Sequence, residues 1–314
     1  MAFLRVEELV KHFNPGEGAL RAVDGVSFEV RQGETVGIVG ESGCGKTTLV
    51  KTLLRLTPPT SGKVWLDGED LASLPESKLR AKRRELQIVF QDPFGSLNPR
   101  HDVETILTTP LKAHGLGSTA ERRQRVLSLL ESVGLPRDAL PRYPHEFSGG
   151  QRQRIGIARA LVLSPRLLIC DEPVSALDLS IQAQILNLLV DAKARFGLSY
   201  LFISHDLSVM RYFADRVLVM YLGKIVETGD HSSLWARPLH PYTRALMQAA
   251  PDPTQRRRAP ALTGELPSPR DVPKGCAFHP RCPLASDRCR IETPLLRAFG
   301  DNQSAACHHP PLDA

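Results

Sequence analysis

The segment Gly40-Glu41-Ser42-Gly43-Cys44-Gly45-Lys46-Thr47 constrains the fold of this chain more than any other feature. It follows the apolar run 35–39 and precedes a segment, 45–56, that we expect to be helical. Glycines let successive backbone N–H groups turn inward around a phosphate, and the N-terminus of the following helix favours an anion. Lys46 would reach the β- and γ-phosphates, and Thr47 would supply a hydroxyl to Mg²⁺. The pattern therefore predicts a phosphate-binding loop between a buried strand and a helix.

A second acidic element lies further along the chain, in Leu167-Leu168-Ile169-Cys170-Asp171-Glu172. Four apolar residues predict a buried strand whose end presents two carboxylates. In a protein with a phosphate-binding loop, Asp171 would hold the hydration shell of Mg²⁺ and Glu172 would orient or deprotonate the attacking water. The alternative is that the two carboxylates only cap the following turn.

Strands and helical segments alternate along most of the chain. Strands are expected at 4–9, 26–30, 35–39, 63–66, 87–90, 167–170, 200–203 and 217–220. This alternation predicts an α/β fold, with a mostly parallel sheet and helices on both faces. Residues of about 92–145 lack long apolar strands and are interpreted as an inserted helical subdomain. We expect one large domain over 1–250, followed over 251–314 by a proline-rich strap and a cysteine-containing extension.

A third motif, Ser148-Gly149-Gly150-Gln151, matches the signature of one family, and with it the chain resembles the nucleotide-binding subunit of an ABC transporter. Ser148 can cap a helix running from Gln151 to Leu161, and the glycines expose N–H groups at its N-terminus. The resemblance implies that this surface faces the γ-phosphate held by another subunit's phosphate loop, so that ATP joins a head-to-tail dimer. It also implies a P-loop NTPase (RecA-like) fold with an antiparallel β subdomain.

The resemblance assigns roles to further residues. It implies that Gln91 senses Mg²⁺ and the attacking water, that Asp178 communicates across the dimer, and that His205 contacts the γ-phosphate. Phe13 stands where the family has an aromatic residue that stacks on adenine, although it could equally be part of the core. Thr48 follows the phosphate loop directly and is assigned to the nucleotide site with it. A full set of motifs that includes Glu172 implies a site competent for hydrolysis.

Three segments narrow the resemblance to the ATPase subunits of dipeptide and oligopeptide importers, and to the F-type subunit among them. They are residues 90–100, 204–209 and 239–243. This implies a paralogous ATPase subunit, two transmembrane permease subunits and an extracytoplasmic peptide-binding protein as partners, at the cytoplasmic face of the membrane. Importers of nickel or other small solutes share these motifs. A soluble ABC ATPase acting on ribosomes or DNA is the rival class, but the chain has neither a second cassette nor long coiled coils.

The tail carries Cys276, Cys282, Cys289 and Cys307. Their spacing lacks the short C-x₂₋₄-C knuckles of structural zinc sites, and unpaired surface thiols are the alternative to a metal site. Four thiolates can also hold an iron–sulfur cluster. The resemblance to the peptide-importer group, whose subunits carry a similar extension, favours a [4Fe–4S] cluster over zinc. We expect such a cluster to be a structural clip.

The charge balance and the cysteine content exclude some classes of function. The chain has 314 residues, with 40 Lys+Arg against 34 Asp+Glu and a formal charge of +6, scattered along its length. Basic residues are not interleaved with aromatic ones, so we expect no nucleic-acid partner. No signal peptide and no membrane-spanning run is visible, so any membrane role would be peripheral. Six cysteines without an export signal indicate a reducing compartment.

Overall fold

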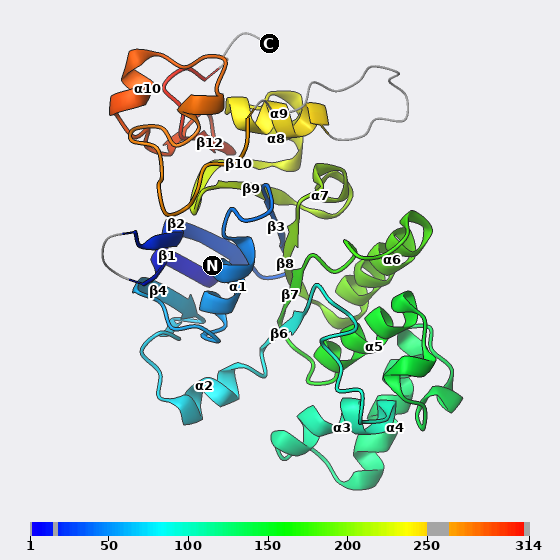
Figure 1. The fold of residues 1–314 in the computed structure, drawn as a ribbon. Helices are drawn as coiled ribbons and strands as arrows, with labels where there is room; N and C mark the ends of the chain where they lie inside the picture. The colour runs from blue at the N-terminus through cyan, green and yellow to red at the C-terminus, as the bar shows by residue number, and fades with distance from the viewer. Residues whose placement is uncertain (1, 15–17, 250–263, 311–314) are drawn as a thin grey trace. The chain divides into compact units, whose positions relative to one another are not determined.

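The computed structural model describes residues 2–14, 18–249 and 264–310. These residues divide into two compact units (Figure 1). Unit 1 comprises residues 1–31, 35–73 and 202–314, and unit 2 comprises 32–34 and 74–201. Each unit is described by itself, and β8 (Ser199–Ser204), which is buried throughout, spans the division between them.

Unit 1 contains a small antiparallel sheet with the strand order β2-β1-β4-β5. Its strands are β1 (Ala2–Phe13), β2 (Leu20–Arg31), β4 (Ser61–Leu66) and β5 (Glu69–Asp70). In β2, Val26, Phe28 and Val30 are buried while the residues between them are exposed. Period-two alternation of this kind buries one face of a sheet and leaves the other in solvent. This sheet is the antiparallel subdomain that the family resemblance implied.

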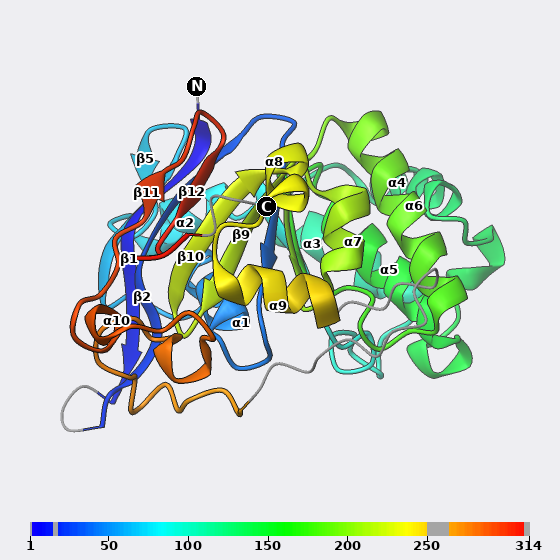
Figure 2. The same ribbon diagram turned by 90° about the horizontal axis from the view of Figure 1, so that it is seen from above.

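A second set of strands in unit 1 carries the phosphate loop. It consists of β3 (Thr35–Val39), β9 (Arg216–Tyr221), β10 (Lys224–Asp230), β11 (Arg297–Ala298) and β12 (Gln303–Ala305). Strands β3 and β9 are parallel, β10 pairs antiparallel with β9, and β12 pairs antiparallel with β10 (Figure 2). All five residues of β3 are buried, as the apolar run predicted. The C-terminal extension therefore continues the same layer of strands, which the sequence did not predict.

Four helices of unit 1 follow these strands: α1 (Lys46–Leu53), α7 (Leu207–Phe213), α8 (His231–Ala236) and α9 (Pro241–Ala249). Helix α1 confirms the helix predicted after the phosphate loop, although it ends three residues earlier than expected. The extension adds the 3₁₀ helix η3 (His279–Arg281) and helix α10 (Asp287–Ile291). Residues 264–273 of the predicted strap form neither helix nor strand, and 251–263 lie outside the described residues.

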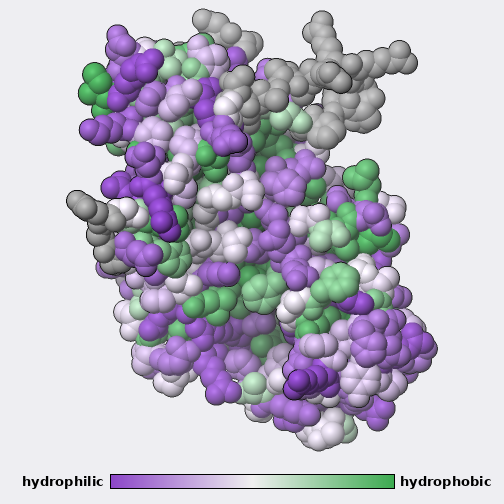
Figure 3. Space-filling model, viewed as in Figure 1, coloured by the Kyte–Doolittle hydropathy of each residue, from purple (hydrophilic) through white to green (hydrophobic). Residues whose placement is uncertain are grey.

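Unit 2 contains the predicted helical insertion. Its elements are α2 (Glu76–Lys82), β6 (Leu86–Val89), α3 (Val103–Ala113), α4 (Thr119–Ser132), α5 (Gly149–Leu161), β7 (Leu167–Asp171), α6 (Leu179–Phe196) and the 3₁₀ turns η1 (Arg137–Ala139) and η2 (Pro144–Glu146). Helices α3, α4 and α5 contact one another, and β6 pairs parallel to β7. Ser118 and Glu121 cap α4 reciprocally. Hydrophilic side chains dominate the helical face at the lower right of Figure 3.

A buried carboxylate ties the extension to the layer of strands in unit 1. Glu227 on β10 is fully buried, and its carboxylate accepts hydrogen bonds from the backbone N–H groups of Leu239 and His240, at 2.7 and 2.8 Å. Gln303 on β12 donates its amide to the same carboxylate at 2.8 Å. Burial raises the pKa of Glu227. A buried acceptor with three donors is costly to remove, so this cluster fixes β10, β12 and the segment before α9 together.

His240 makes this part of the fold sensitive to acid. Its side chain is 1% exposed, and burial lowers its pKa from 6.5 to about 3, so the folded protein holds a neutral imidazole. The Nδ1 atom accepts a hydrogen bond from the backbone N–H of Tyr242 at 3.1 Å. Between about pH 6.5 and pH 3, His240 binds a proton in the unfolded chain but not in the folded chain. The stabilisation is therefore complete above about pH 6.5 and is lost as the pH falls toward 3.

We expect the free energy of unfolding to fall by about 2 kcal/mol between pH 6.5 and pH 5 because of this one group. Asn at position 240 can accept the same backbone hydrogen bond without titrating in this range. Chemical denaturation of wild type and His240→Asn at both pH values measures the effect. The variant should lose about 2 kcal/mol less than wild type over this interval, and equal losses would show that the imidazole is not held neutral.

No helix in the described ranges is long and apolar enough to cross a membrane.

Candidate nucleotide-binding site

The phosphate loop of unit 1 owes its shape to glycines at points of close approach. Gly45 has φ +109°, and a Cβ there would strike the carbonyl oxygen of Ala22. A Cβ at Gly40 would strike the carbonyl oxygen of Met220. Residues with side chains cannot occupy these positions without moving the backbone. The loop is thus held against β9 and β2, with its following helix, α1, beginning at Lys46.

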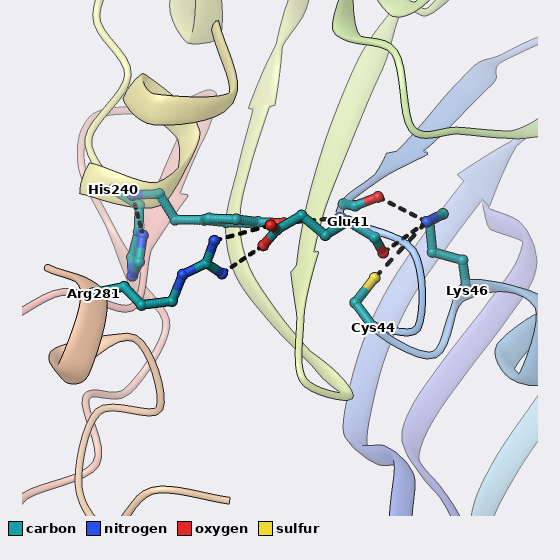
Figure 4. Close-up of polar contacts among 7 residues, drawn as sticks. Glu41, Cys44, Lys46, His240 and Arg281 are labelled. Carbon is teal, nitrogen blue, oxygen red and sulfur yellow. Dashed lines mark hydrogen bonds and ion pairs between the residues drawn. The ribbon is translucent and has the colours of Figure 1, made fainter. Parts of the chain in front are cut away.

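Lys46 lies over this loop. Its side chain is 5% exposed, and its Nζ donates hydrogen bonds to the carbonyl oxygens of Gly40 at 2.7 Å and Glu41 at 3.0 Å. Figure 4 shows the ammonium group folded back onto the loop. A buried ammonium held by carbonyl oxygens is ready to bind phosphate oxygens in the same place. Cys44 is buried beside it, and this burial raises the pKa of the thiol.

Two carboxylates of unit 2 lie at the end of β7 (Leu167–Asp171). Asp171 ends β7 and is 3% exposed, while Glu172 follows it with φ +47°, a left-handed conformation that is unusual for a side-chain-bearing residue. The Nε2 of Gln91 donates a hydrogen bond to Oε2 of Glu172 at 3.1 Å. The turn after β7 is closed by Ser175, whose hydroxyl donates to the backbone carbonyl of Glu172 at 3.1 Å.

The signature motif of unit 2 caps α5 as expected. The Oγ of Ser148 accepts from the backbone N–H of Gln151 at 3.4 Å, and the side chain of Gln151 accepts from the N–H of Ser148 at 3.0 Å. Ser148 is exposed. A Cβ at Gly150 would approach Ile181 on α6 to 2.6 Å, so glycine allows α5 and α6 to pack closely. The predicted cap at Ser148 is confirmed, although α5 begins two residues earlier than expected, at Gly149, and the cap leaves the motif at the surface.

The other predicted residues lie at the ends of elements. Asp178 is the N-cap residue of α6 and is exposed, and next to it Leu179 is 83% exposed. His205 follows β8 and is also exposed. Phe13 ends β1, is half-buried, and has Lys11 Nζ 4.8 Å from its ring centre.

The predicted set is divided between the two units. Unit 1 carries the phosphate loop, Thr48, Phe13 and His205. Unit 2 carries Gln91, Asp171, Glu172, the signature motif and Asp178. Within unit 2 the structure joins Gln91 to Glu172, and within unit 1 it places Lys46 on the loop.

Comparison with known proteins decides the family. The family model described as ABC transporter matches residues 23–175. The probable peptide ABC transporter ATP-binding protein y4tS of Sinorhizobium fredii is 52% identical over 98% of this chain and 90% of its own length. The chain belongs to the ABC transporter family. A second model, for the C-terminal region of oligopeptide/dipeptide transporters, matches residues 226–289 of this ABC protein.

Further relatives and solved structures of ABC proteins agree. The oligopeptide transport ATP-binding protein AppF of Bacillus subtilis is 53% identical over 93% of this chain and 90% of its own. The di/tripeptide transport ATP-binding protein DppF of Pseudomonas aeruginosa is 48% identical over 98% of this chain and 97% of its own. The dimeric ABC transporter cassette MJ0796, bound to ADP and phosphate, superposes with a TM-score of 0.66 at 30% identity, covering 73% of this chain and 98% of its own. The ABC ATPase fold is thereby shown.

Sequence reasoning missed two residues of this ABC protein that contact its phosphate loop. The hydroxyl of Tyr242 accepts a hydrogen bond from the backbone N–H of Glu41 at 2.8 Å. The guanidinium of Arg281, in the C-terminal extension, binds the Glu41 carboxylate. Tyr242 stands in the segment 239–243 that pointed to the peptide-importer group, but its sequence gives no sign of a partner about 200 residues away. Arg281 could have been noted only as a basic residue next to Cys282.

The four cysteines of the extension lie near one another. Burial, together with Cys276, Cys282 and Cys289, raises the pKa of Cys307 to about 11. The described residues contain no group of three or more His, Cys, Asp or Glu side chains that could hold a metal ion. In a [4Fe–4S] cluster each of the four thiolates binds a different iron, so its ligands need not converge on one point.

Proposed function

We propose that this chain is the ATP-hydrolysing subunit of an ABC importer of di- and oligopeptides. The observation that carries the proposal is the match of residues 226–289 to the C-terminal region of oligopeptide/dipeptide transporters, in a chain about half identical to peptide-transport ATPases over nearly its full length. The match to the ABC transporter model supports ATP hydrolysis, and the match of the C-terminal region supports peptides as the transported substrate. The contact of Gln91 with Glu172 supports hydrolysis, since it holds the carboxylate proposed as the base.

In this mechanism the phosphate loop binds the β- and γ-phosphates through its N–H groups and Lys46. Thr47, Asp171 and Gln91 would hold the Mg²⁺ ion that accompanies ATP, directly or through its hydration shell. Glu172 takes the proton of the attacking water, with His205 on the γ-phosphate. Phe13 stacks on adenine. Ser148 of the signature motif is exposed, which supports contact of the motif with the ATP bound by a second subunit. Asp178 is exposed too, which supports its proposed role in communication across the dimer. ATP closes this dimer, and hydrolysis reopens it.

The partners follow from the same role. We propose that a paralogous ATPase subunit completes the dimer and that two transmembrane permease subunits hold it at the cytoplasmic face of the membrane. An extracytoplasmic protein would deliver the peptide. The surface beside Gln91 supports a permease contact, since Phe94 is 60% exposed there with Arg152 stacked 4.0 Å from its ring centre. Large exposed aromatic rings are common anchors in protein interfaces.

Uptake measurements test the substrate class. Cells that lack the gene are given the wild-type chain or none, and the entry of labelled dipeptides, tripeptides and Ni²⁺ is measured. We expect the wild-type chain to restore peptide uptake and to leave Ni²⁺ uptake unchanged. Restoration of Ni²⁺ uptake alone would keep the importer role and overturn the peptide assignment. If the wild-type chain restores neither peptide uptake nor Ni²⁺ uptake, the assignments to peptide import and to nickel import are both overturned.

We also propose that Cys276, Cys282, Cys289 and Cys307 hold a [4Fe–4S] cluster that clips the extension together. The support is the proximity of the four thiols, since burial first and then the charges of Cys276, Cys282 and Cys289 raise the pKa of Cys307. When bound, the cluster supplies a cross-link between residues far apart in sequence. The cysteines anchor it, and the backbone bond from the Cys276 N–H to the Cys289 carbonyl, at 2.8 Å, already brings two of them together.

Iron analysis tests the cluster. Protein purified without oxygen should contain about four irons per chain. Cys276→Ser and Cys282→Ser should each lower the iron content and the melting temperature of the extension, whereas Cys170→Ser, in the buried strand β7, should keep the iron. Iron at background level in the wild-type protein, or unchanged in both variants, would rule out ligand duty for these residues.

A further inference from the structure

An ion pair joins the C-terminal extension to the phosphate loop. Arg281 donates from Nη1 to Oε2 of Glu41 at 2.7 Å and from Nη2 to Oε1 at 2.9 Å (Figure 4). The two parallel bonds form the bidentate geometry that orients a carboxylate as well as attracting it. The Arg281 side chain is 4% exposed and that of Glu41 27%, so the pair is far less accessible to solvent than a surface salt bridge.

The same loop residue is held from a second side. The backbone N–H of Glu41 donates to the Tyr242 hydroxyl, while its carbonyl oxygen accepts from Lys46. Glu41 is therefore fixed at its N–H, its carbonyl and its carboxylate. Its carbonyl is one of the acceptors that keep the Lys46 ammonium over the loop, together with the carbonyl of Gly40. A shift of Glu41 would move both the loop backbone and the lysine that reaches the phosphates.

Arg281 is in turn fixed by the cysteine-containing part of the extension. It ends η3, directly before Cys282, and the Cys282 N–H donates to the carbonyl of His279 at 3.3 Å. Phe278, 2% exposed, packs edge-on against Tyr221 and lies 5.4 Å from the ring centre of Tyr242. The guanidinium carbon lies 6.0 Å from the ring centre of Tyr221.

Arg281 thus lies beside packed aromatic rings, and its position depends on the position of the segment 276–282, which carries Cys276 and Cys282. Cys282 follows Arg281 directly in the chain, and Arg281 binds Glu41. Contacts of this kind transmit a change only if both ends have states that the link can favour differently.

We propose that Arg281 is a positioning residue for ATP binding, which couples the state of the cysteine-containing extension to the conformation of the phosphate loop. The inference rests on the proposed function only in taking the loop as the nucleotide site. With the extension packed, Arg281 holds Glu41 and the loop is shaped for phosphate. When the packing of the extension is loosened, the Arg281–Glu41 ion pair breaks and the affinity for nucleotide falls. Coupling in binding is reciprocal, so nucleotide must also stabilise the extension.

Affinity for Mg²⁺·ADP tests the first half of this coupling. We expect Arg281→Gln and Glu41→Gln each to weaken binding about tenfold, within the usual range for coupled sites. Because the two residues act as one pair, the double variant should bind no more weakly than the weaker single variant. Arg288→Gln is the matched control, since Arg288 belongs to the same extension but pairs with Glu292 at the surface. Its affinity should equal that of wild type.

Hydrogen exchange tests the reciprocal half and separates positioning from a purely structural role. Mg²⁺·ADP should slow exchange of the amides of 276–289 in wild type and in Arg288→Gln, but not in Arg281→Gln. Affinities of both single variants within twofold of wild type, or equal slowing in Arg281→Gln, would overturn the proposal. If Arg281→Gln fails to fold, Glu41→Gln gives the same comparison. Failure of wild type to bind ADP would instead overturn the nucleotide site itself.

Discussion

Replacing Glu172 with glutamine is expected to slow ATP hydrolysis by at least about a hundredfold while leaving ATP bound, because a positioned general base contributes about 10²–10⁴-fold to a rate. Glutamine keeps the shape of the side chain and can still contact Gln91, but it cannot take a proton. The variant should therefore accumulate ATP in closed dimers. Phosphate release and the amount of retained nucleotide, measured on the same sample, check both parts of this expectation.

The matched control for this substitution is Glu131→Gln in the same unit, where Glu131 pairs with Arg137 at the surface with its side chain 52% exposed. Exposed pairs of this kind contribute about 0–1 kcal/mol, so hydrolysis should be unchanged. Brisk hydrolysis in Glu172→Gln would remove Glu172 from the role of base. The left-handed backbone at Glu172 would then need another explanation.

Replacing Lys46 with alanine is expected to weaken ATP binding by about one to two orders of magnitude. A hydrogen bond to a charged group contributes about 1.5–3 kcal/mol, and 1.4 kcal/mol corresponds to a tenfold change in affinity. Hydrolysis should fall further, because the lysine also stabilises charge that develops in the transition state. Binding of a fluorescent ATP analogue and steady-state hydrolysis measure the two effects separately.

Lys51→Ala in the same helix serves as the control, since Lys51 is exposed and lies one turn beyond the loop. It should bind ATP as wild type does. Melting temperatures of both variants near that of wild type would show that the fold is kept. Unchanged ATP affinity in Lys46→Ala would contradict the assignment of this loop as the phosphate site.

The local parts of the site could be predicted because each is written in a short segment. A strand, glycines at points of close approach and a helix start define the phosphate loop, and Ser148 with Gln151 defines a capping box that spans four residues. Strands β3, β7 and β9 could be predicted from the sequence because each is a continuous apolar run. Their burial on both faces leaves no polar alternation to confuse the pattern.

The contacts made by the extension could not be predicted for the opposite reason. Strand β12 is only three residues long, and Gln303 within it is a buried polar residue that is satisfied by Glu227, 76 positions away. Arg281 and Glu41 are 240 positions apart. Pairings of this kind depend on tertiary packing and leave no periodic signal in the sequence. The one indication in the sequence was the resemblance of the cysteine-containing tail to the extension of the peptide-importer group.

The most direct test of the central claim is the rate of ATP hydrolysis by the complex that copurifies with this chain from membranes, placed in lipid nanodiscs. The rate is measured with and without di- and tripeptides and their extracytoplasmic binding protein. We predict that peptide-loaded binding protein stimulates hydrolysis and that the Glu172→Gln complex shows no stimulation. Hydrolysis that is the same with and without peptide would contradict the coupling of this ATPase to peptide import.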